Sequence, residues 1–183
     1  MTRFWEHGYA ATSVRDLGAC MGLGAASLYN AFGDKRALFT RCLDRYLDAN
    51  MRERIARQEA NHPPRRAVEA FLTESVERSL ADRRGCLLVN TALEIAPHDE
   101  EIGAVVAERL GELEAFFHRC VQRGQQDGTI ARRARPRDLA RLFLTTVMGL
   151  RVLARARPEP ALLHGAVRQA LALLDPPSAE VSP

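Results

Sequence analysis

The sequence predicts an all-α protein, and three observations support this fold class. Apolar residues recur at spacings of three and four along almost the whole chain, which is typical of helices. Period-two alternation, which would indicate strands, is nearly absent. Glycine and proline divide the chain into segments of helical length, as in "NHPP" at 61–64 and "DPP" at 175–177. We therefore expect a small N-terminal helical domain over residues 1–46, a larger helical domain over 47–176 and a tail over 177–183.

The bulk composition is that of an ordinary globular protein. The chain has 183 residues, of which 46% are hydrophobic and 27% are charged, enough for a small domain plus a larger one. No apolar run reaches the roughly 18 residues of a membrane span, and "MTRFWEHGY" lacks the apolar core of a secretion signal. We expect a cytoplasmic protein without membrane association. A formal net charge of +3 does not by itself indicate a nucleic-acid partner.

The four cysteines predict free thiols in a reducing compartment. Cys20, Cys42, Cys86 and Cys120 are far apart, without a C-x-x-C pair or a Cys/His cluster at zinc spacing. We therefore expect no metal and no cofactor. A redox role remains open for Cys86, because it follows the arginines of "RRG" and nearby arginines can lower the pKa of a thiol.

The first helices follow from local signals near the N-terminus. Phe4 and Trp5 are the apolar anchors of a short first helix. Ser13 and Asp16 fit a capping box, which predicts a second helix over about 14–22 that ends at a glycine suited to left-handed geometry.

A third helix is predicted over residues 25–32, directly after a tight glycine turn. Leu28 and Phe32 are four apart and should hold this helix to the core. Two short helices joined in this way, within a three-helix cluster, form a helix-turn-helix. The alanines that begin the third helix keep it slim enough for a major groove about 12 Å wide. Its outer face carries the hydrogen-bonding side chains of Ser27, Tyr29 and Asn30.

The stretch "GYAATSVRDLGACMGLGAASLYNAFGDKRALF", Gly8 to Phe39, resembles the DNA-binding domain of TetR-type bacterial transcriptional regulators. The Gly-Tyr, Thr-Ser, glycine turn, Leu-Tyr-x-x-Phe and lysine before leucine all fall in register. The resemblance implies phosphate contacts from Thr12, Tyr29 and Lys35, and makes Asn30 the specificity candidate. The complete set of DNA-binding residues that it implies is Thr12, Ser13, Arg15, Ala25, Ser27, Tyr29, Asn30 and Lys35.

The chain departs from the family pattern at two places. The family's first helix extends well upstream of the position of Phe4, whereas only "MTRFWEHG" stands here. We expect a truncated first helix, either from a start placed downstream of the natural one or from a shortened form of the protein, and reduced DNA affinity if Met1 is genuine. Gly24 stands where the family usually has a serine or threonine cap, which removes one capping bond.

Beyond Asp34, which can cap the next helix, the chain is expected to build a larger helical region. An apolar stripe predicts a long connecting helix over 34–50 that continues toward Ile55. The last two helices are apolar on more than one face, so we expect them to form a homodimer that places two recognition helices on double-stranded, palindromic operator DNA. The later helices are predicted over residues 65–81, 86–95, 100–126, 137–156 and 161–174.

Several aromatic, flexible or polar side chains occupy positions that should face the core of these later helices. Polar groups at such positions either line a cavity or find partners within the core, and both interpretations remain open. Our hypothesis is a ligand-responsive regulator, in family terms a repressor, that an unknown small-molecule effector releases from DNA. The candidate effector residues are Phe71, Cys86, Asn90, Glu94, Phe116, Phe117, Met148 and Arg151.

Other classes of function are less well supported. One alternative is a ligand-binding or interaction module whose helix-turn-helix has lost operator binding. An enzyme would need a nucleophile and a base, and neither Cys86 with His98 nor His118 with Glu114 has a recognisable local signature, so we expect no catalytic residues. A metal sensor would need ligand spacing that the five scattered histidines lack.

Overall fold

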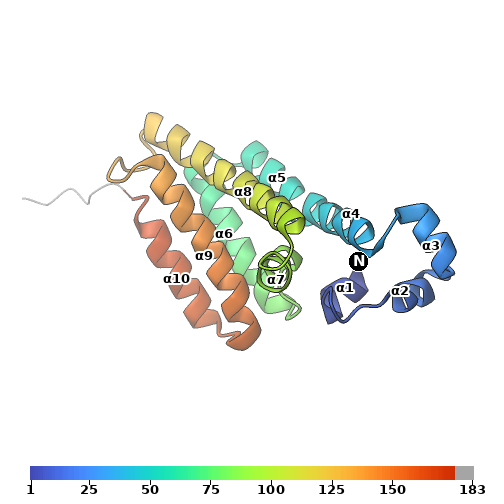
Figure 1. The fold of residues 1–183 in the computed structure, drawn as a ribbon. Helices are drawn as coiled ribbons and strands as arrows, with labels where there is room; N and C mark the ends of the chain where they lie inside the picture. The colour runs from blue at the N-terminus through green and yellow to red at the C-terminus, as the bar shows by residue number, and fades with distance from the viewer. Residues whose placement is uncertain (176–183) are drawn as a thin grey trace, which may run out of the picture. The chain divides into compact units, whose positions relative to one another are not determined.

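A computed structural model describes residues 1–175, which form helices and no strands (Figure 1). This confirms the predicted all-α fold, and the expected tail at 177–183 lies outside the described residues. Within residues 1–175, no helix combines the length and the apolarity that crossing a membrane requires. The chain divides into two compact units. Unit 1 contains residues 1–52 and 86–107, and unit 2 contains residues 53–85 and those from 108 onward.

Unit 1 is organised around aromatic side chains. Phe4 and Phe39 are buried with their ring centroids 5.1 Å apart, and Trp5 meets Tyr46 at 5.0 Å. A six-residue helix is too short to be stable alone, so this packing is what holds the first helix in place. The elements of unit 1 are α1 (Thr2–His7), α2 (Val14–Met21), α3 (Ala25–Phe32), α4 (Lys35–Leu47), η1 (Asp48–Arg52), α7 (Leu87–Glu94) and the beginning of α8 (Glu100–Gln126).

The predicted signals at the ends of α2 are confirmed. Ser13 Oγ accepts a hydrogen bond from the Asp16 backbone N–H at 3.1 Å, and the Asp16 carboxylate accepts one from the Ser13 N–H at 3.0 Å. Helix α2 ends at Gly22, whose φ of 65° is left-handed. Gly24 precedes α3 without a side-chain cap, as expected. Helix α3 has the predicted bounds, because its start and stop are encoded locally.

The predicted connecting helix is confirmed as a helical segment that runs from residue 35 to residue 61, and it contains a wider turn that the sequence did not predict. Helix α4 ends at Leu47 and is followed by η1, a π-helical segment of five residues, before α5 (Glu53–Asn61) begins. The side-chain amide of Asn50 donates to the carbonyl of Tyr46 at 2.8 Å. That carbonyl is the one the Asn50 backbone N–H would use in an α-helix, so side-chain competition accounts for the wider turn.

Unit 2 is a helical bundle with an aromatic centre. Helices α6, α9 and α10 pack against one another, and α5 packs against α6 (Figure 1). Neighbouring rings of four buried phenylalanines lie 5.1–5.5 Å apart, and these are Phe71, Phe116, Phe117 and Phe143. The elements are α5, α6 (Pro64–Ala81), the later part of α8, α9 (Pro136–Ala156) and α10 (Pro160–Ala172). The predicted bounds of α6, α8, α9 and α10 agree within two residues, and no bounds were predicted for α5.

The compact units differ from the domains expected from the sequence. Residues 86–107 group with the N-terminal segment, and within this unit α7 packs against α4. Leu87, Leu88 and Thr91 of α7 are buried. No local signal indicates this long-range pairing. The functional division near residue 46 stays a prediction.

Candidate nucleic-acid interface

Helix α3 has one buried side and one open side. Leu28 is fully buried, whereas Tyr29 is 48% exposed and Asn30 is exposed beside it. Ala25 and Ser27, at the start of the helix, are exposed as well. All four predicted contact residues on α3 are therefore accessible to a partner.

Arg15 on α2 is exposed. The phosphate contact predicted for Thr12, which precedes α2, needs correction. Thr12 is only 1% exposed, and its hydroxyl donates to the Gly8 carbonyl at 2.7 Å. A phosphate does not reach a hydroxyl that is buried and already paired, so the expected contact is replaced by a structural role in closing the α1–α2 connection. Ser13 is exposed at the start of α2, and its hydrogen bonds hold the pKa of Asp16 below its usual value.

Lys35 is oriented by an aromatic ring that sequence reasoning did not connect to it. Its Nζ lies 4.3 Å from the centroid of the Tyr9 ring, within the range of a cation–π contact. Tyr9 packs against Phe39 at 5.0 Å and is thereby fixed. Burial raises the pKa of Tyr9, so the ring remains a neutral phenol at physiological pH. The contact restricts the ammonium group before any phosphate binds.

Arg36 ties the start of α4 to the residues around the start of α8 in the same unit. Its guanidinium lies 2.8 Å from the Asp99 carboxylate and 2.6 Å from the Glu101 carboxylate. The hydrogen bond that Arg36 donates to Glu101, followed by the charge of Asp99, raises the pKa of Arg36. This arginine, which sequence reasoning missed, braces the helix that carries Lys35.

Glu94 holds the α1–α2 connection. Its Oε1 accepts a hydrogen bond from the Ala10 backbone N–H at 2.9 Å. A Cβ on Gly8 would come within 2.8 Å of the same carboxylate, and Gly8 also has a positive φ of 82°. The positive φ favours glycine there, whereas the carboxylate is the end of a flexible side chain that can shift. Because these contacts engage its carboxylate, we leave Glu94 out of the candidate effector residues.

The remaining effector candidates fall into two groups. Phe71 and Phe117 pack at 5.5 Å in unit 2, which also contains Phe116, the half-buried Met148 and the buried Arg151. Cys86 and Asn90 belong to unit 1, on the half-buried side of α7. The structure therefore divides the candidate effector residues between the two compact units.

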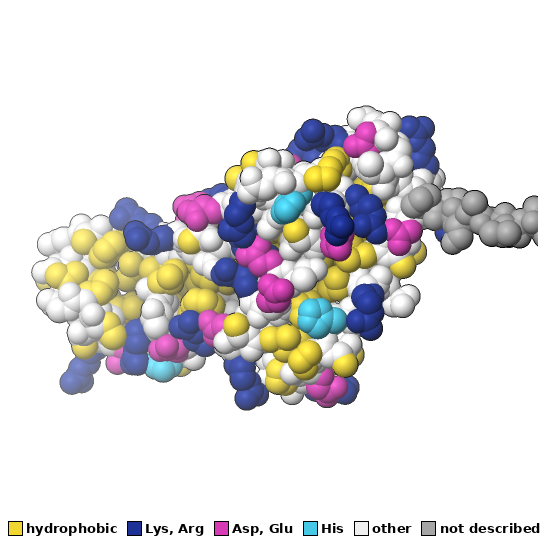
Figure 2. Space-filling view, turned by 180° about the vertical axis from the view of Figure 1, so that it is seen from behind, with side chains coloured by type: hydrophobic (Ala, Val, Ile, Leu, Met, Phe, Trp, Pro, Cys, Tyr) yellow, Lys and Arg dark blue, Asp and Glu magenta, His cyan; other side chains and the backbone are white. Residues whose placement is uncertain are grey.

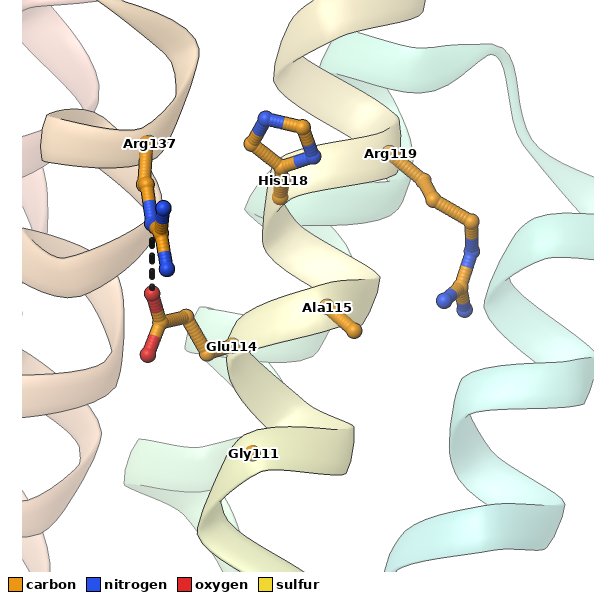
Figure 3. A pocket seen from close by; sticks show the side chains of 6 residues that line it. All are labelled: Gly111, Glu114, Ala115, His118, Arg119 and Arg137. Atoms are coloured by element: carbon orange, nitrogen blue, oxygen red, sulfur yellow. Dashed lines mark ion pairs between the residues drawn. The ribbon is translucent and has the colours of Figure 1, made fainter.

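A surface groove of about 430 Å³ lies along α8 in unit 2 (Figure 3). Its charged side chains are already paired: Glu114 with Arg137 at 3.9 Å and Arg141 at 3.2 Å, and Arg119 with Glu59 at 2.9 Å. The Glu114 carboxylate is thus engaged by arginines rather than by His118. The lining residues are Gly111, Glu114, Ala115, His118, Arg119 and Arg137, and none of them is a predicted effector residue.

The described residues offer little for metal or thiol chemistry. Among residues 1–175, no group of three or more His, Cys, Asp or Glu side chains is placed to hold a metal ion. The four cysteines are free thiols, as predicted. Burial raises the pKa of Cys120 to about 12, which keeps this thiol protonated and unreactive at neutral pH.

One face of the molecule shows no separation of charge by sign. On the face shown in Figure 2, basic and acidic side chains are interspersed. The net charge of only +3 likewise gives no general indication of a nucleic-acid partner.

Known proteins similar to this chain are regulators. Two family models match: "Bacterial regulatory proteins, tetR family" over residues 1–42, and "Tetracyclin repressor-like, C-terminal domain" over residues 63–170. The uncharacterized HTH-type transcriptional regulator YezE of Bacillus subtilis is 32% identical over 153 residues, which are 79% of each chain. The HTH-type transcriptional repressor ComR of Escherichia coli is 29% identical over 170 residues, which cover 85% of this chain and 75% of ComR.

The solved structures include a protein bound to DNA. A cysteine mutant of the TetR family transcriptional regulator CifR, in complex with 26-base-pair operator DNA, matches with a TM-score of 0.82 and 32% identity. The match covers 94% of this chain and 91% of CifR.

Proposed function

Because this chain belongs to the tetR family of bacterial regulatory proteins, we propose that two copies of it read a palindromic operator and release it when a small molecule binds. It is a DNA-binding transcriptional regulator, and its class is not enzymatic. The repressor name of ComR supports repression as the outcome of binding. Operator DNA in bacteria lies in the cytoplasm, so we place the protein there.

The exposed polar face of α3 is the observation that carries this proposal. Leu28 anchors the helix from inside while Tyr29 and Asn30 stay accessible, and Lys35 follows at the start of α4. Phosphate contacts from Tyr29 and Lys35 would set the register on the duplex, and Asn30 would read a base edge. The operator complex of the similar regulator CifR supports this use of the fold.

Lys35 is expected to contribute to operator affinity equally for all operator sequences, because it would contact a phosphate and not a base. Lys35→Ala should weaken binding to all operator variants by about tenfold, since it removes one charge-assisted contact per recognition helix. The slope of log affinity against log salt should fall by about 1 per recognition helix. Footprinting of the DNA that flanks the gene, followed by fluorescence anisotropy over a salt series, measures both quantities.

The matched control for this experiment is Arg45→Ala, which removes an exposed cation from the last turn of the same helix. Binding should then stay close to that of the wild type. A second variant, Asn30→Ala, should lower discrimination between base pairs by about 1–3 kcal/mol at one operator position. If Tyr29→Ala and Lys35→Ala protected a palindrome as strongly as the wild type does, the exposed face of α3 would be ruled out as the DNA-binding surface.

A homodimer through α9 and α10 is the second part of the proposal. The exposed Leu142 and Leu153 and the half-buried Gly149 lie along α9, at spacings of seven and four residues. A Cβ on Gly149 would meet no atom within 4 Å in the single chain, so a partner helix could approach closely there. Leu173 adds exposed apolar surface just beyond α10. Apolar faces of this kind favour an isologous four-helix interface.

Leu153→Glu is expected to shift the protein from dimer to monomer. A buried, unpaired carboxylate at the interface should weaken dimerisation by about 2–4 kcal/mol, and operator affinity should fall with it because one half-site is lost. Sedimentation equilibrium measures the change. Leu93→Glu is the control, because this leucine of α7 is even more exposed at 64%. If Leu153→Glu remained as dimeric as Leu93→Glu, the interface would have to lie elsewhere.

Effector control is the third part. A coupling free energy of about 1–3 kcal/mol between effector and operator would change operator affinity by roughly 5- to 150-fold. Within unit 1, Glu94 accepts a hydrogen bond from the α1–α2 connection, and Asp99 forms an ion pair with Arg36. Helix α8 begins among the residues of unit 1 and continues into those of unit 2. A displacement of α8 on ligand binding would therefore act on the segment that carries Lys35.

A further inference from the structure

Lys35 differs from its neighbour Arg36 in what holds its charged group. In the part of the chain that the structure describes, no carboxylate forms an ion pair with Lys35, whereas Arg36 lies 2.8 Å from Asp99. The ammonium group of Lys35 lies instead 4.3 Å from the centroid of the Tyr9 ring. A ring attracts a cation without neutralising it, so the charge of Lys35 remains available to a phosphate.

The ring of Tyr9 is itself fixed by packing. Tyr9 is half-buried, and its ring centroid lies 5.0 Å from that of Phe39 and 6.1 Å from that of Phe4. Both phenylalanines are buried and pack against each other at 5.1 Å. Burial raises the pKa of Tyr9, and the charge of Arg36 opposes this rise without reversing it. The ring is therefore a neutral platform in a fixed place.

The backbone of Lys35 is fixed as well. Lys35 is the first residue of α4, directly after Asp34, whose carboxylate accepts a hydrogen bond from the Ala37 N–H at 2.7 Å. Helix α4 packs against α3, which carries the exposed Tyr29 and Asn30. Both ends of the Lys35 side chain are thus determined relative to these two short helices.

This arrangement affects how strongly a phosphate can be bound. A lysine side chain has many conformers, and most of them are lost when its ammonium group pairs with an anion. Where the free protein already holds the side chain in place, part of this entropy has been lost before binding. A lysine over a fixed ring should therefore bind a phosphate more tightly than a freely rotating lysine at the same position.

We propose that Tyr9 is a positioning residue for operator binding, whose ring holds the ammonium group of Lys35 ready for an operator phosphate. The proposal rests on the proposed phosphate contact of Lys35 and identifies the residue that sets its strength. Tyr9 acts through Lys35 alone and makes no contact with a base. Loss of its ring should therefore weaken operator binding without changing which base pairs are preferred.

The first test is the operator affinity of Tyr9→Leu, which removes the ring and keeps an apolar side chain. Affinity for the palindrome found by footprinting should fall by about fivefold over two recognition helices, less than in Lys35→Ala. The salt dependence should stay that of the wild type, because the charge of Lys35 remains. Tyr9→Phe keeps the ring and loses the hydroxyl with its hydrogen bond to Arg36, so its affinity should stay within about twofold of the wild type.

A double variant separates positioning from a general structural role. In protein that already carries Lys35→Ala, the further change Tyr9→Leu should lower operator affinity by less than about twofold, because the group that Tyr9 positions is gone. A tyrosine that only stabilised unit 1 would instead lower the affinity by the same factor with and without Lys35. Fluorescence anisotropy over a salt series measures all four proteins.

The second test needs no DNA. Lys35 is the only lysine of the chain, so lysine labelled with carbon-13 gives a single set of side-chain NMR signals. The ring current of Tyr9 should shift its ε-methylene protons upfield in the wild type and in Tyr9→Phe, but not in Tyr9→Leu. Trp5→Leu is the control, because it removes a ring that packs on Tyr46 at 5.0 Å, and it should leave the shift unchanged. The wild type and Tyr9→Phe test the contact even if Tyr9→Leu does not fold.

Three results would overturn the proposal: an unshifted Lys35 signal in the wild type, wild-type affinity in Tyr9→Leu, or an equal loss with and without Lys35. Failure of the proposed function looks different. If Lys35→Ala bound the operator as the wild type does, the phosphate contact and the positioning role would both be contradicted. If Lys35→Ala lost affinity but Tyr9→Leu did not, only the positioning role would be contradicted.

Discussion

Operator binding is expected to be lost when Leu28 is replaced by alanine. Leu28 is the fully buried anchor of α3, an eight-residue helix that would not be stable alone. A buried Leu→Ala change costs about 2–5 kcal/mol, and here that loss falls on the packing that presents Tyr29 and Asn30. Operator affinity measured by fluorescence anisotropy should fall by about a hundredfold or more.

The control for this experiment is Met21→Ala, which shortens an exposed apolar side chain at the end of α2. Its affinity should stay within about threefold of the wild type, because a surface substitution changes stability by only about 0.5 kcal/mol. Circular dichroism should show that both variants keep most of their helix, since unit 2 does not depend on Leu28. Wild-type affinity in Leu28→Ala would mean that DNA is bound by another surface.

The features that the sequence predicted well are those set by local chemistry. The bounds of α2 and α3 follow from the Ser13–Asp16 capping box and from the left-handed geometry of Gly22, which involve residues within a few positions of each other. The inward position of Leu28 and the outward position of Tyr29 follow from helical periodicity in the same way. Local rules therefore located the candidate reading face without the structure.

The features that sequence reasoning missed depend on contacts between distant parts of the chain. The ring of Tyr9 beneath Lys35, and the Asp99 carboxylate beside Arg36, are brought into place by the fold of unit 1. Thr12 shows the converse error: the family resemblance implied a phosphate contact, but burial of its hydroxyl depends on how α1 meets α2. Pattern alone does not reveal whether a polar side chain is exposed.

Arg54 is a similar case, and it indicates where the stability of unit 2 is most vulnerable. On a helix with exposed neighbours such as Arg57, nothing in the sequence distinguishes this buried arginine. Its charge is compensated by Glu74 on α6. Burial raises the pKa of Glu74, but Arg54 and Arg57 outweigh this effect and leave the pKa below its usual value. The carboxylate is thus ionised at neutral pH and stabilises the folded state.

Glu74→Gln is accordingly expected to lower the free energy of unfolding by about 3 kcal/mol at neutral pH, because it leaves a buried guanidinium without its counter-charge. Urea denaturation measures the loss. A carboxyl whose folded pKa is depressed stabilises the protein above its unfolded pKa, near 4.5, and loses this effect as pH falls through the folded value. Wild type and Glu74→Gln should therefore converge in acid.

Two comparisons decide whether the missing counter-charge is the cause of that loss. Glu77→Gln, an exposed position on the same helix, should leave stability unchanged within about 0.5 kcal/mol. The double replacement of Arg54 by methionine and Glu74 by leucine should recover most of the lost stability, because a buried pair exchanged for packed apolar groups is often neutral or stabilising. If the double variant were instead as unstable as Glu74→Gln, the loss would arise from packing around Phe71 and not from an uncompensated charge.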